Sequence, residues 1–310
     1  MPAKKSKAPV RARRGALGAL LVLILLSLTL LLGLINAKTL RVVYLDLPIS
    51  GLDPRLEGSR LLYVSDLKIS NARQARQSAR LLSRLCSAQP DVMLLGGDLC
   101  SADLFSSLSV TLGVKTRLQL EEQLQSARSA FLLEMNRLSL RGGIYAVLGD
   151  EDPGLSFEDE RRSNIRFLKN EVAFAQIRGA RLPIYGCAAN AAQEGYVFSF
   201  SDTGSGPMLI LFHDPGMYRQ VALAASKRSK NAREYLLLSG HTLGGQLRLG
   251  KFFLLHRDLN RLYTQHADEN GLYADDTGLR MLVSPGVGSQ LFPFRLGTRP
   301  SAYIITLKAG

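Results

Sequence analysis

RLLYVSDLK, residues 60–68, carries the pattern that decides the fold: a short apolar run that ends in an acidic side chain, here Asp66. Similar apolar runs, each followed by an acidic side chain or a histidine, return four times along the chain. Asp98 follows Met93–Leu95, Asp150 and Asp152 follow Tyr145–Leu148, His213 follows Leu209–Phe212, and His241 follows Leu236–Leu238. Short apolar runs bounded by polar turns are typical of buried strands, so we expect each of these side chains at the end of a strand.

The rest of the sequence alternates similar runs with amphipathic segments. We predict strands at Arg41–Leu47, Arg60–Val64, Val92–Leu95, Ile144–Leu148, Met208–Phe212, Tyr235–Leu238, Phe252–Leu255, Met281–Val283 and Ala302–Leu307. We predict helices at Arg73–Cys86, Arg117–Leu140 and Phe157–Leu168. Strands alternate with helices in the first part of the sequence, whereas in the last part strands follow one another directly. This order predicts one mixed α/β domain over residues 38–310, with a partly parallel sheet and an antiparallel tail.

The N-terminus has the features of a membrane anchor. Six basic and no acidic residues lie within residues 1–14, and residues 15–35 are uncharged and rich in leucine. A helix of that length spans about 31 Å, which matches the hydrocarbon core of a bilayer. We therefore predict a basic cytoplasmic tail over residues 1–14 and a single transmembrane helix over residues 15–36. By the positive-inside rule we expect the basic tail in the cytoplasm and the domain on the other side of the membrane. A cleaved signal peptide is the alternative, but its apolar region is usually only about 7–15 residues long.

The net charge of +13 is less informative than it first looks. Without the six basic residues of the tail, 33 basic residues face 26 acidic ones. The chain has no tryptophan, only 7% aromatic residues and no recognisable nucleic-acid module, so we expect no nucleic-acid partner. A content of 46% hydrophobic and 21% charged residues excludes a disordered chain. Cys86, Cys100 and Cys187 are too few for a disulfide framework and are interpreted as small buried side chains, although one pair stays open.

The polar residues at the strand ends have two explanations. Singly, an aspartate after a strand usually caps a helix, and a histidine there is usually a satisfied structural residue. Together, in five successive places, they indicate a ligand site, because open α/β sheets collect ligands at the carboxyl ends of their strands. Carboxylates and imidazoles are ligands of divalent metals. The sequence therefore predicts a metal site, whereas His256 and His266, in a charged region, are expected at the surface.

These motifs resemble those of the calcineurin-like metallophosphoesterases, and in particular their bacterial membrane-anchored branch. They are SDLK (65–68), GGDL (96–99), LGDED (148–152), FHDP (212–215) and SGHTLGGQ (239–246), followed by VSPGVG (283–288) and GTRP (297–300). The resemblance runs from about Arg41 to the C-terminus. It implies a four-layer α/β/β/α sandwich preceded by one transmembrane helix, with a two-metal site for phosphoester hydrolysis at the strand ends.

The sequence departs from the family pattern at four positions. Lys68 stands where the first histidine is expected, Asp150 replaces an asparagine, Glu151 replaces the catalytic histidine, and Leu243 replaces the last histidine. The resemblance then implies one metal position built from Asp66, Lys68, Asp98 and Leu243, where two ligands are lost. The other position would use Asp98, Asp150, His213 and His241, all of which can coordinate. We therefore expect one divalent ion, Mn, Zn or Fe, rather than two.

We hypothesise that the ammonium of Lys68 replaces the missing metal ion. An ammonium beside Asp66 and Asp98 would offset two carboxylates that otherwise repel each other, in the place of the missing cation. The hypothesis fails if the ammonium points into solvent, and the alternative is an ordinary surface lysine.

Two functions remain open at this point. In the first, the chain hydrolyses a lipid or cell-envelope phosphodiester or monoester with one metal, Lys68 binds a phosphate oxygen, and Glu151 donates the proton. In the second, the same fold is a pseudoenzyme that acts as an envelope binding or regulatory module. A further basic feature is the stripe of Arg73, Arg76, Arg80 and Arg84 on one helix face, which is either a contact for anionic lipid or polymer or, more ordinarily, a solvated face.

Overall fold

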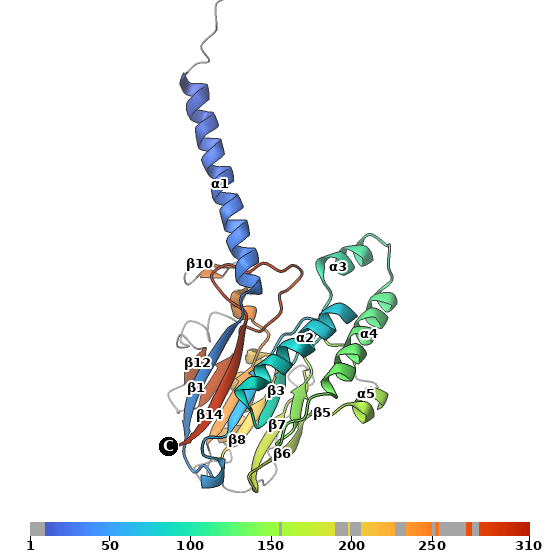
Figure 1. Ribbon diagram of the computed structural model, residues 1–310, viewed down its shortest axis with the longest axis vertical. Helices are drawn as coiled ribbons and strands as arrows, with labels where there is room; N and C mark the ends of the chain where they lie inside the picture. The colour runs from blue at the N-terminus through green and yellow to red at the C-terminus, as the bar shows by residue number, and fades with distance from the viewer. Residues whose placement is uncertain are drawn as a thin grey trace, which may run out of the picture.

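Two β-sheets packed face to face form the centre of the molecule, and helices cover their outer faces (Figure 1). The computed structural model describes residues 10–154, 157–189, 198, 206–226, 234–249, 252–253, 271–274 and 279–310. His256, His266 and the second half of the strand predicted at Phe252–Leu255 lie outside these residues. The arrangement is the four-layer α/β/β/α sandwich that the sequence predicted, with one apolar helix at the N-terminus.

The first sheet has six strands in the order β1 (Arg41–Ile49), β14 (Ser301–Ala309), β2 (Arg60–Val64), β3 (Val92–Gly96), β4 (Ile144–Val147) and β5 (Ile165–Phe167). Neighbours from β2 to β5 run parallel, while β14 is antiparallel to β2 and parallel to β1. The predicted helix over Phe157–Leu168 is wrong in its second half. Helix α5 (Phe157–Arg162) is short, and Ile165 instead pairs with Ile144 because the edge of the sheet offers backbone partners there.

The second sheet also has six strands, in the order β12 (Leu272–Ala274), β13 (Arg280–Val283), β9 (Tyr235–Ser239), β8 (Met208–Leu211), β7 (Ala180–Gly186) and β6 (Glu171–Ile177). The expectation of an antiparallel tail is wrong for its centre, where β13, β9, β8 and β7 are parallel neighbours. Only the edge pairs β12–β13 and β6–β7 are antiparallel. A small separate ribbon joins β10 (Arg248–Leu249) to β11 (Phe252–Phe253).

Three hydrophobic layers hold the sandwich together. Along β2, Leu61 and Tyr63 point between the two sheets, whereas Leu62 and Val64 point to the outer face of the first sheet. That outer face is covered by α2 (Ala72–Leu85) and α4 (Arg117–Met135), and α6 (Tyr218–Ser226) covers the second sheet. Alternate residues of a strand face opposite sides, so a fully apolar strand is what a sheet buried on both faces requires.

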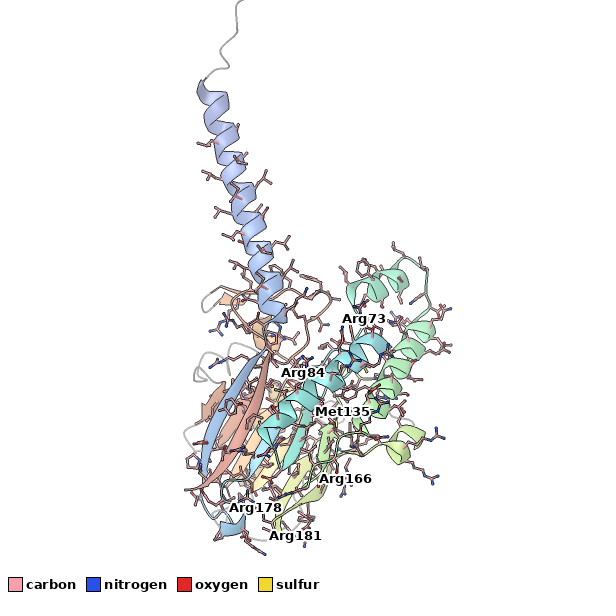
Figure 2. The ribbon with its side chains drawn as sticks, viewed as in Figure 1. Arg73, Arg84, Met135, Arg166, Arg178 and Arg181 are labelled. Atoms are coloured by element: carbon pink, nitrogen blue, oxygen red, sulfur yellow. The ribbon has the colours of Figure 1, made fainter. Side chains whose placement is uncertain are left out.

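The two long domain helices begin with side-chain caps. Asn71 caps α2, and Thr116 and Gln119 form a capping box at α4. Helix α4 ends at Met135, five residues before the predicted end at Leu140, because the side chain of Asn164 donates to the carbonyls of Met135 and Leu138. The four arginines of the α2 stripe are all exposed, and Figure 2 shows Arg73 and Arg84 at its two ends.

Helix α1 (Val10–Lys38) projects from one end of the domain (Figure 1). Its segment Gly15–Lys38, with a mean hydropathy of 2.8, is long and apolar enough to cross a membrane, and its leucines are exposed. The base of the helix is fixed to the domain, because the backbone N–H of Arg295 donates to the carbonyl of Gly33 at 3.0 Å. The ring of Phe294 packs directly on Gly33, where a side chain would not fit.

Candidate metal centre

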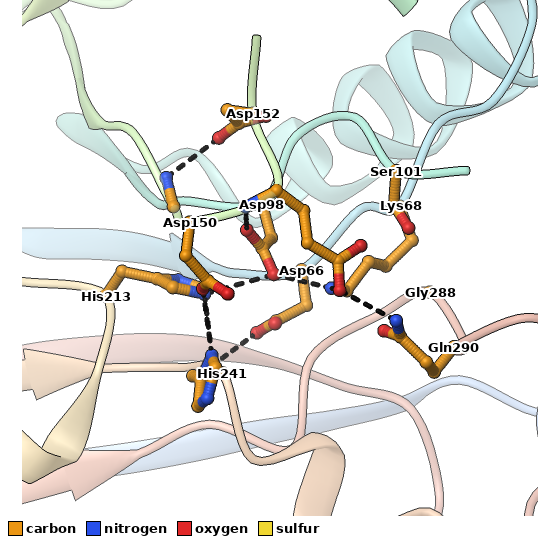
Figure 3. A network of polar contacts seen from close by, with 12 residues as sticks. Asp66, Lys68, Asp98, Ser101, Asp150, Asp152, His213, His241, Gly288 and Gln290 are labelled. Atoms are coloured by element: carbon orange, nitrogen blue, oxygen red, sulfur yellow. Dashed lines mark hydrogen bonds and ion pairs between the residues drawn. The ribbon is translucent and has the colours of Figure 1, made fainter. Parts of the chain in front are cut away.

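The predicted site residues come from loops that leave both sheets at the same edge. Asp66 and Lys68 follow β2, Asp98 follows β3, Asp150 and Glu151 follow β4, His213 follows β8, and His241 follows β9. Figure 3 shows the side chains that it labels among these, namely Asp66, Lys68, Asp98, Asp150, His213 and His241, gathered close together. The convergence arises because the strands that precede them are parallel neighbours within each sheet, so their carboxyl ends lie together.

Several of these residues have a left-handed backbone that ordinary side chains avoid. The φ angles are 52° at Asp66, 52° at Lys68, 50° at Asp98 and 66° at His241. Each such residue costs about 1–3 kcal/mol and persists only where its surroundings hold it in place. Here the N–H of Asp66 donates to the carbonyl of Gly97 at 2.9 Å, and the N–H of Lys68 donates to the carbonyl of Asp98 at 3.0 Å. Clustered strain of this kind is typical of functional sites.

A possible metal-binding cluster consists of Asp98, Asp150, His213 and His241, whose ligand atoms all lie within 4.8 Å of one another. Nε2 of His213 lies 3.1 Å from Oδ2 of Asp98 and 3.3 Å from Oδ1 of Asp150. Nδ1 of His241 lies 3.0 Å from the same oxygen of Asp150 and 3.3 Å from Nε2 of His213.

These separations fit a metal ion. Two ligand atoms bound about 2.1 Å from one ion lie about 3.0 Å apart at a right angle and about 3.4 Å apart at a tetrahedral angle. The orientation of His213 also fits, because its Nδ1–H donates to the carbonyl of Gly96 at 2.7 Å. In the neutral ring this bond leaves the lone pair on Nε2, which faces the other three ligands. Two imidazoles and two carboxylates suit Mn, Zn or Fe.

Glycines allow the ligands to approach so closely. A Cβ on Gly149 would lie 2.5 Å from the backbone nitrogen of Asp98 and would collide with its carboxylate. A Cβ on Gly97 would lie 2.7 Å from Nδ1 of His213, and its φ of 87° also favours glycine. Any larger residue at either position would push the ligands apart.

Lys68 does not point into solvent. Its side chain is 3% exposed, and its ammonium lies 2.5 Å from Oδ2 of Asp98 and 3.2 Å from Oε1 of Glu151. Burial alone would lower the pKa of Lys68, but Asp98, Asp66 and Glu151 raise it above its usual value. The hypothesis that Lys68 replaces a cation would fail if its ammonium pointed into solvent, and the ammonium is buried instead. Lys68 contacts Asp98 directly but acts on Asp66 only through its charge.

Asp66 and Leu243 are the two remaining residues of the metal position that is expected to be empty, the one that also includes Lys68 and Asp98. Asp66 is fully buried, and its Oδ2 accepts the backbone N–H of His241 at 3.1 Å. Its Oδ1 has no hydrogen-bond partner among the described residues, and Asp66 is not part of the four-residue cluster. The side chain of Leu243 is also fully buried and offers no ligand atom. Burial raises the pKa of Asp66, and the charge of Asp98 raises it further.

Glu151 is held by three contacts. Its backbone N–H donates to Oδ1 of Asp98 at 3.1 Å, and its Oε1 receives the ammonium of Lys68 and a hydrogen bond from Nε2 of Gln290 at 2.7 Å. Gln290 is in turn fixed by Gln246, whose side chain exchanges two hydrogen bonds with the Gln290 backbone. The sequence analysis missed Gln290, since an isolated glutamine in a loop carries no motif.

The charges of the cluster are strongly coupled. Hydrogen bonds from His213 and His241 lower the pKa of Asp150 far below its usual range. Burial would raise the pKa of Asp98, but His213 and Lys68 lower it to about 2. Burial would likewise lower the pKa of both histidines, but Asp98, Asp150 and Asp66 raise the pKa of His213, and Asp150 and Asp214 raise the pKa of His241. The metal-free site thus favours ionised carboxylates and protonated histidines, and a metal ion would displace the imidazole protons when it binds.

Arg295 is a second residue that the sequence did not single out. It is fully buried, and its guanidinium donates to backbone carbonyls, including those of Leu243 at 3.1 Å and Pro285 at 2.8 Å. Burial lowers its pKa to about 10. By joining these two loops, Arg295 positions the backbone that encloses Asp66, since the N–H of Gly288 donates to the Asp66 carbonyl.

Comparison with known proteins agrees with this picture. No protein-family model matches the chain. A protein from Danio rerio is 25% identical over 312 residues, which cover 93% of this chain and 62% of the relative. A protein from Bos taurus is 23% identical over 322 residues, or 96% of this chain and 64% of the relative. Both are named transmembrane protein with metallophosphoesterase domain.

The chain spans a little over three fifths of the length of these curated relatives. The similarity supports the metallophosphoesterase family for the domain. Together with α1, the named transmembrane character of the relatives supports membrane anchoring. Fold and site together define an α/β/β/α sandwich with a candidate metal centre at its strand ends and one N-terminal helix long enough to cross a membrane, similar to proteins named for a metallophosphoesterase domain.

Proposed function

We propose that this chain is a membrane-anchored phosphoester hydrolase that works with one divalent metal ion. The observation that carries the proposal is the convergence of four ligand atoms from Asp98, Asp150, His213 and His241 within 4.8 Å. The name of the relatives, which includes a metallophosphoesterase domain, favours phosphoesters as the substrate class. When bound, the metal supplies Lewis-acid polarisation of a phosphoryl oxygen and lowers the pKa of a water molecule.

The protein's own residues divide the remaining work. Lys68 carries a fixed positive charge beside Asp98 and binds a phosphate oxygen, a role in which an ammonium acts as a compact point charge. Glu151 donates the proton to the leaving oxygen once its carboxyl group, whose Oε1 here faces the Lys68 ammonium, has taken up a proton from solvent. Its side chain is 30% exposed, so a leaving group can reach it, and Gln290 keeps it in one orientation.

The substrate is proposed to be a lipid or cell-envelope phosphoester. A pocket of about 270 Å³ is lined by Lys68, by Ala37 at the base of α1, and by Leu291 and Phe292 together with several polar side chains. A lining that combines an ammonium with polar and apolar groups beside a membrane helix suits an amphiphilic molecule, with its phosphate at Lys68. The same proposal includes three further points: the chain belongs to the bacterial membrane-anchored branch, residues 38–310 form a single domain, and this domain lies outside the plasma membrane. The location outside the membrane is inferred from the basic residues of the tail.

The alternative is a pseudoenzyme that uses the same fold as an envelope binding or regulatory module. The specific observation in its favour is that Lys68 and Leu243 occupy the places of two family ligands, while Glu151 replaces the catalytic histidine. In that case the remaining cluster would hold a structural metal, or none.

One experiment separates the two functions. The full chain in detergent micelles is stripped of metal, reloaded with Mn²⁺ and assayed with p-nitrophenyl phosphate and bis-p-nitrophenyl phosphate. His213→Ala and Asp98→Ala should both lose turnover and bound manganese, because each removes a ligand. Asp46→Ala, an exposed aspartate on β1, serves as the matched control and should retain both. Native protein without turnover would reject the hydrolase, and its manganese content would then tell whether a structural metal persists.

A further inference from the structure

The surface of α3 (Leu104–Thr111), of the turn that follows it and of the first turn of α4 is unusually apolar. Phe105 is 80% exposed, Leu108 44%, Leu112 74%, Val114 73% and Leu118 65%. We call these five residues the α3 patch. Soluble surfaces rarely gather so many large apolar side chains in one place unless a partner or a membrane covers them.

Helix α3 buries a polar side chain and exposes large apolar ones, whereas a surface helix of a soluble protein usually does the opposite. The only buried residue of α3 is Ser106, whose Oγ lies 3.3 Å from Nε2 of Gln123, while Phe105 and Leu108 are exposed and its other large apolar residues are half-buried. Residues 104–114 carry no charge, and Lys115 and Arg117 follow directly. An aromatic and aliphatic face bordered by basic residues is typical of segments that lie in the interface of a bilayer.

The α3 patch is physically continuous with the base of α1. The N–H of Leu104 donates to the carbonyl of Leu291 at 2.8 Å, and residues 291 and 292 are themselves about two-fifths exposed at 40% and 39%. The same loop continues to Phe294 and Arg295, which contact Gly33 of α1. Figure 1 shows α3 at the end of the domain from which α1 leaves, level with the lower end of that helix.

We propose that the α3 patch is a second membrane contact, inserted into the boundary between headgroups and acyl chains of the bilayer that α1 crosses. Its occupant is lipid rather than protein, because the patch is continuous with a helix of membrane-spanning length and is bordered by cations that suit anionic headgroups. The proposal concerns how the domain sits on the membrane and is independent of catalysis.

The absence of tryptophan from the sequence provides a clean reporter. Phe105→Trp introduces a single tryptophan at an exposed position of the α3 patch, so folding should not be disturbed. The matched control is Leu133→Trp, which is 67% exposed on α4. It is close to Met135, which Figure 2 shows well away from α1 and α3. Each full-length variant is reconstituted in vesicles of phosphatidylethanolamine and phosphatidylglycerol, with and without brominated acyl chains.

Bromine quenches tryptophan only at short range, so the proposal expects brominated lipid to quench Phe105→Trp about fivefold more strongly than Leu133→Trp. Equal and weak quenching of the two variants would overturn it. A blue-shifted emission of Phe105→Trp that is insensitive to brominated lipid but depends on protein density would also overturn it, since a second copy of the chain would then cover the patch.

Discussion

Replacing Lys68 with methionine tests whether its ammonium stands in for a cation. The substitution keeps most of the side-chain volume but leaves Asp98, which is fully buried, without the ammonium that lies 2.5 Å away. Removing one partner of a buried ion pair costs about 3–5 kcal/mol, because the other charge stays desolvated. For a domain of this size, about 2–4 °C per kcal/mol predicts a thermal midpoint lower by roughly 6–20 °C in the metal-free protein.

The control for this prediction is Lys169→Met, because Lys169 is exposed. A surface change of this kind should shift stability by less than about 0.5 kcal/mol. Both variants and the native full chain are unfolded by heat in detergent micelles, with circular dichroism of the domain as the signal.

Manganese supplies the second half of the test. In Lys68→Met the carboxylates of Asp66 and Asp98 lose the ammonium and keep His213 as the nearby group that lowers the pKa of both, so added Mn²⁺ should stabilise this variant more than the native chain. A ligand at a hundred times its dissociation constant contributes about 2.7 kcal/mol, which would recover much of the loss. The reasoning is refuted if Lys68→Met melts with Lys169→Met, or if manganese stabilises the variant and the native chain equally.

Three further predictions follow from other buried contacts. Gly149→Ala should weaken Mn²⁺ binding about tenfold or more in calorimetric titrations, because its Cβ collides with Asp98. Gly154→Ala, where a Cβ would meet nothing within 4 Å, should leave affinity unchanged, and equal affinities would contradict the steric explanation. Arg128→Met should lower the free energy of unfolding by about 3–5 kcal/mol, since Arg128 is buried and pairs with Asp159 at 2.8 Å. Arg137→Met, which breaks only a surface pair, should change it by less than about 1 kcal/mol in the same thermal assay. Burial raises the pKa of Cys100 and Cys187 well above the usual thiol value, so at pH 8 both should resist a thiol reagent in the native chain and react after denaturation. Rapid native labelling of either cysteine, read by mass spectrometry, would show that these thiols are accessible.

The parts of the fold that could be predicted are those whose signal is local. The strands that carry Asp66, Asp98, His213 and His241 are continuous apolar runs with polar turns, and a sheet covered on both faces requires that composition. Strands β6 and β7 were missed because their buried positions include small residues, Ala173 and Ala175, which do not look like a core. A usable signal was present between them, since Arg178 and Gly179 both have positive φ and form a tight two-residue hairpin turn.

The candidate site also contains residues that the sequence predicted and residues that it did not. Its four clustered ligands each follow a predicted strand, so their proximity results from parallel pairing that the order of elements already indicated. Gln290 and Arg295 could not be found in this manner. Both lie in the loop between β13 and β14, and their contacts with Glu151 and with the Leu243 carbonyl depend on how that loop folds back over the strand ends. The cysteine pairing that the sequence left open is settled, because all three cysteines are free thiols.

The junction between α1 and β1 determines where the protein can work. Helix α1 ends at Lys38 and β1 begins at Arg41, so two residues connect them, and a connection of that length spans at most about 7 Å. The domain therefore has no tether on which to swing. A domain joined this closely to a helix that crosses a bilayer samples only a thin layer beside that bilayer. Its rate of encounter with a molecule in the same membrane then depends on how many copies share an area of membrane rather than a volume of solution.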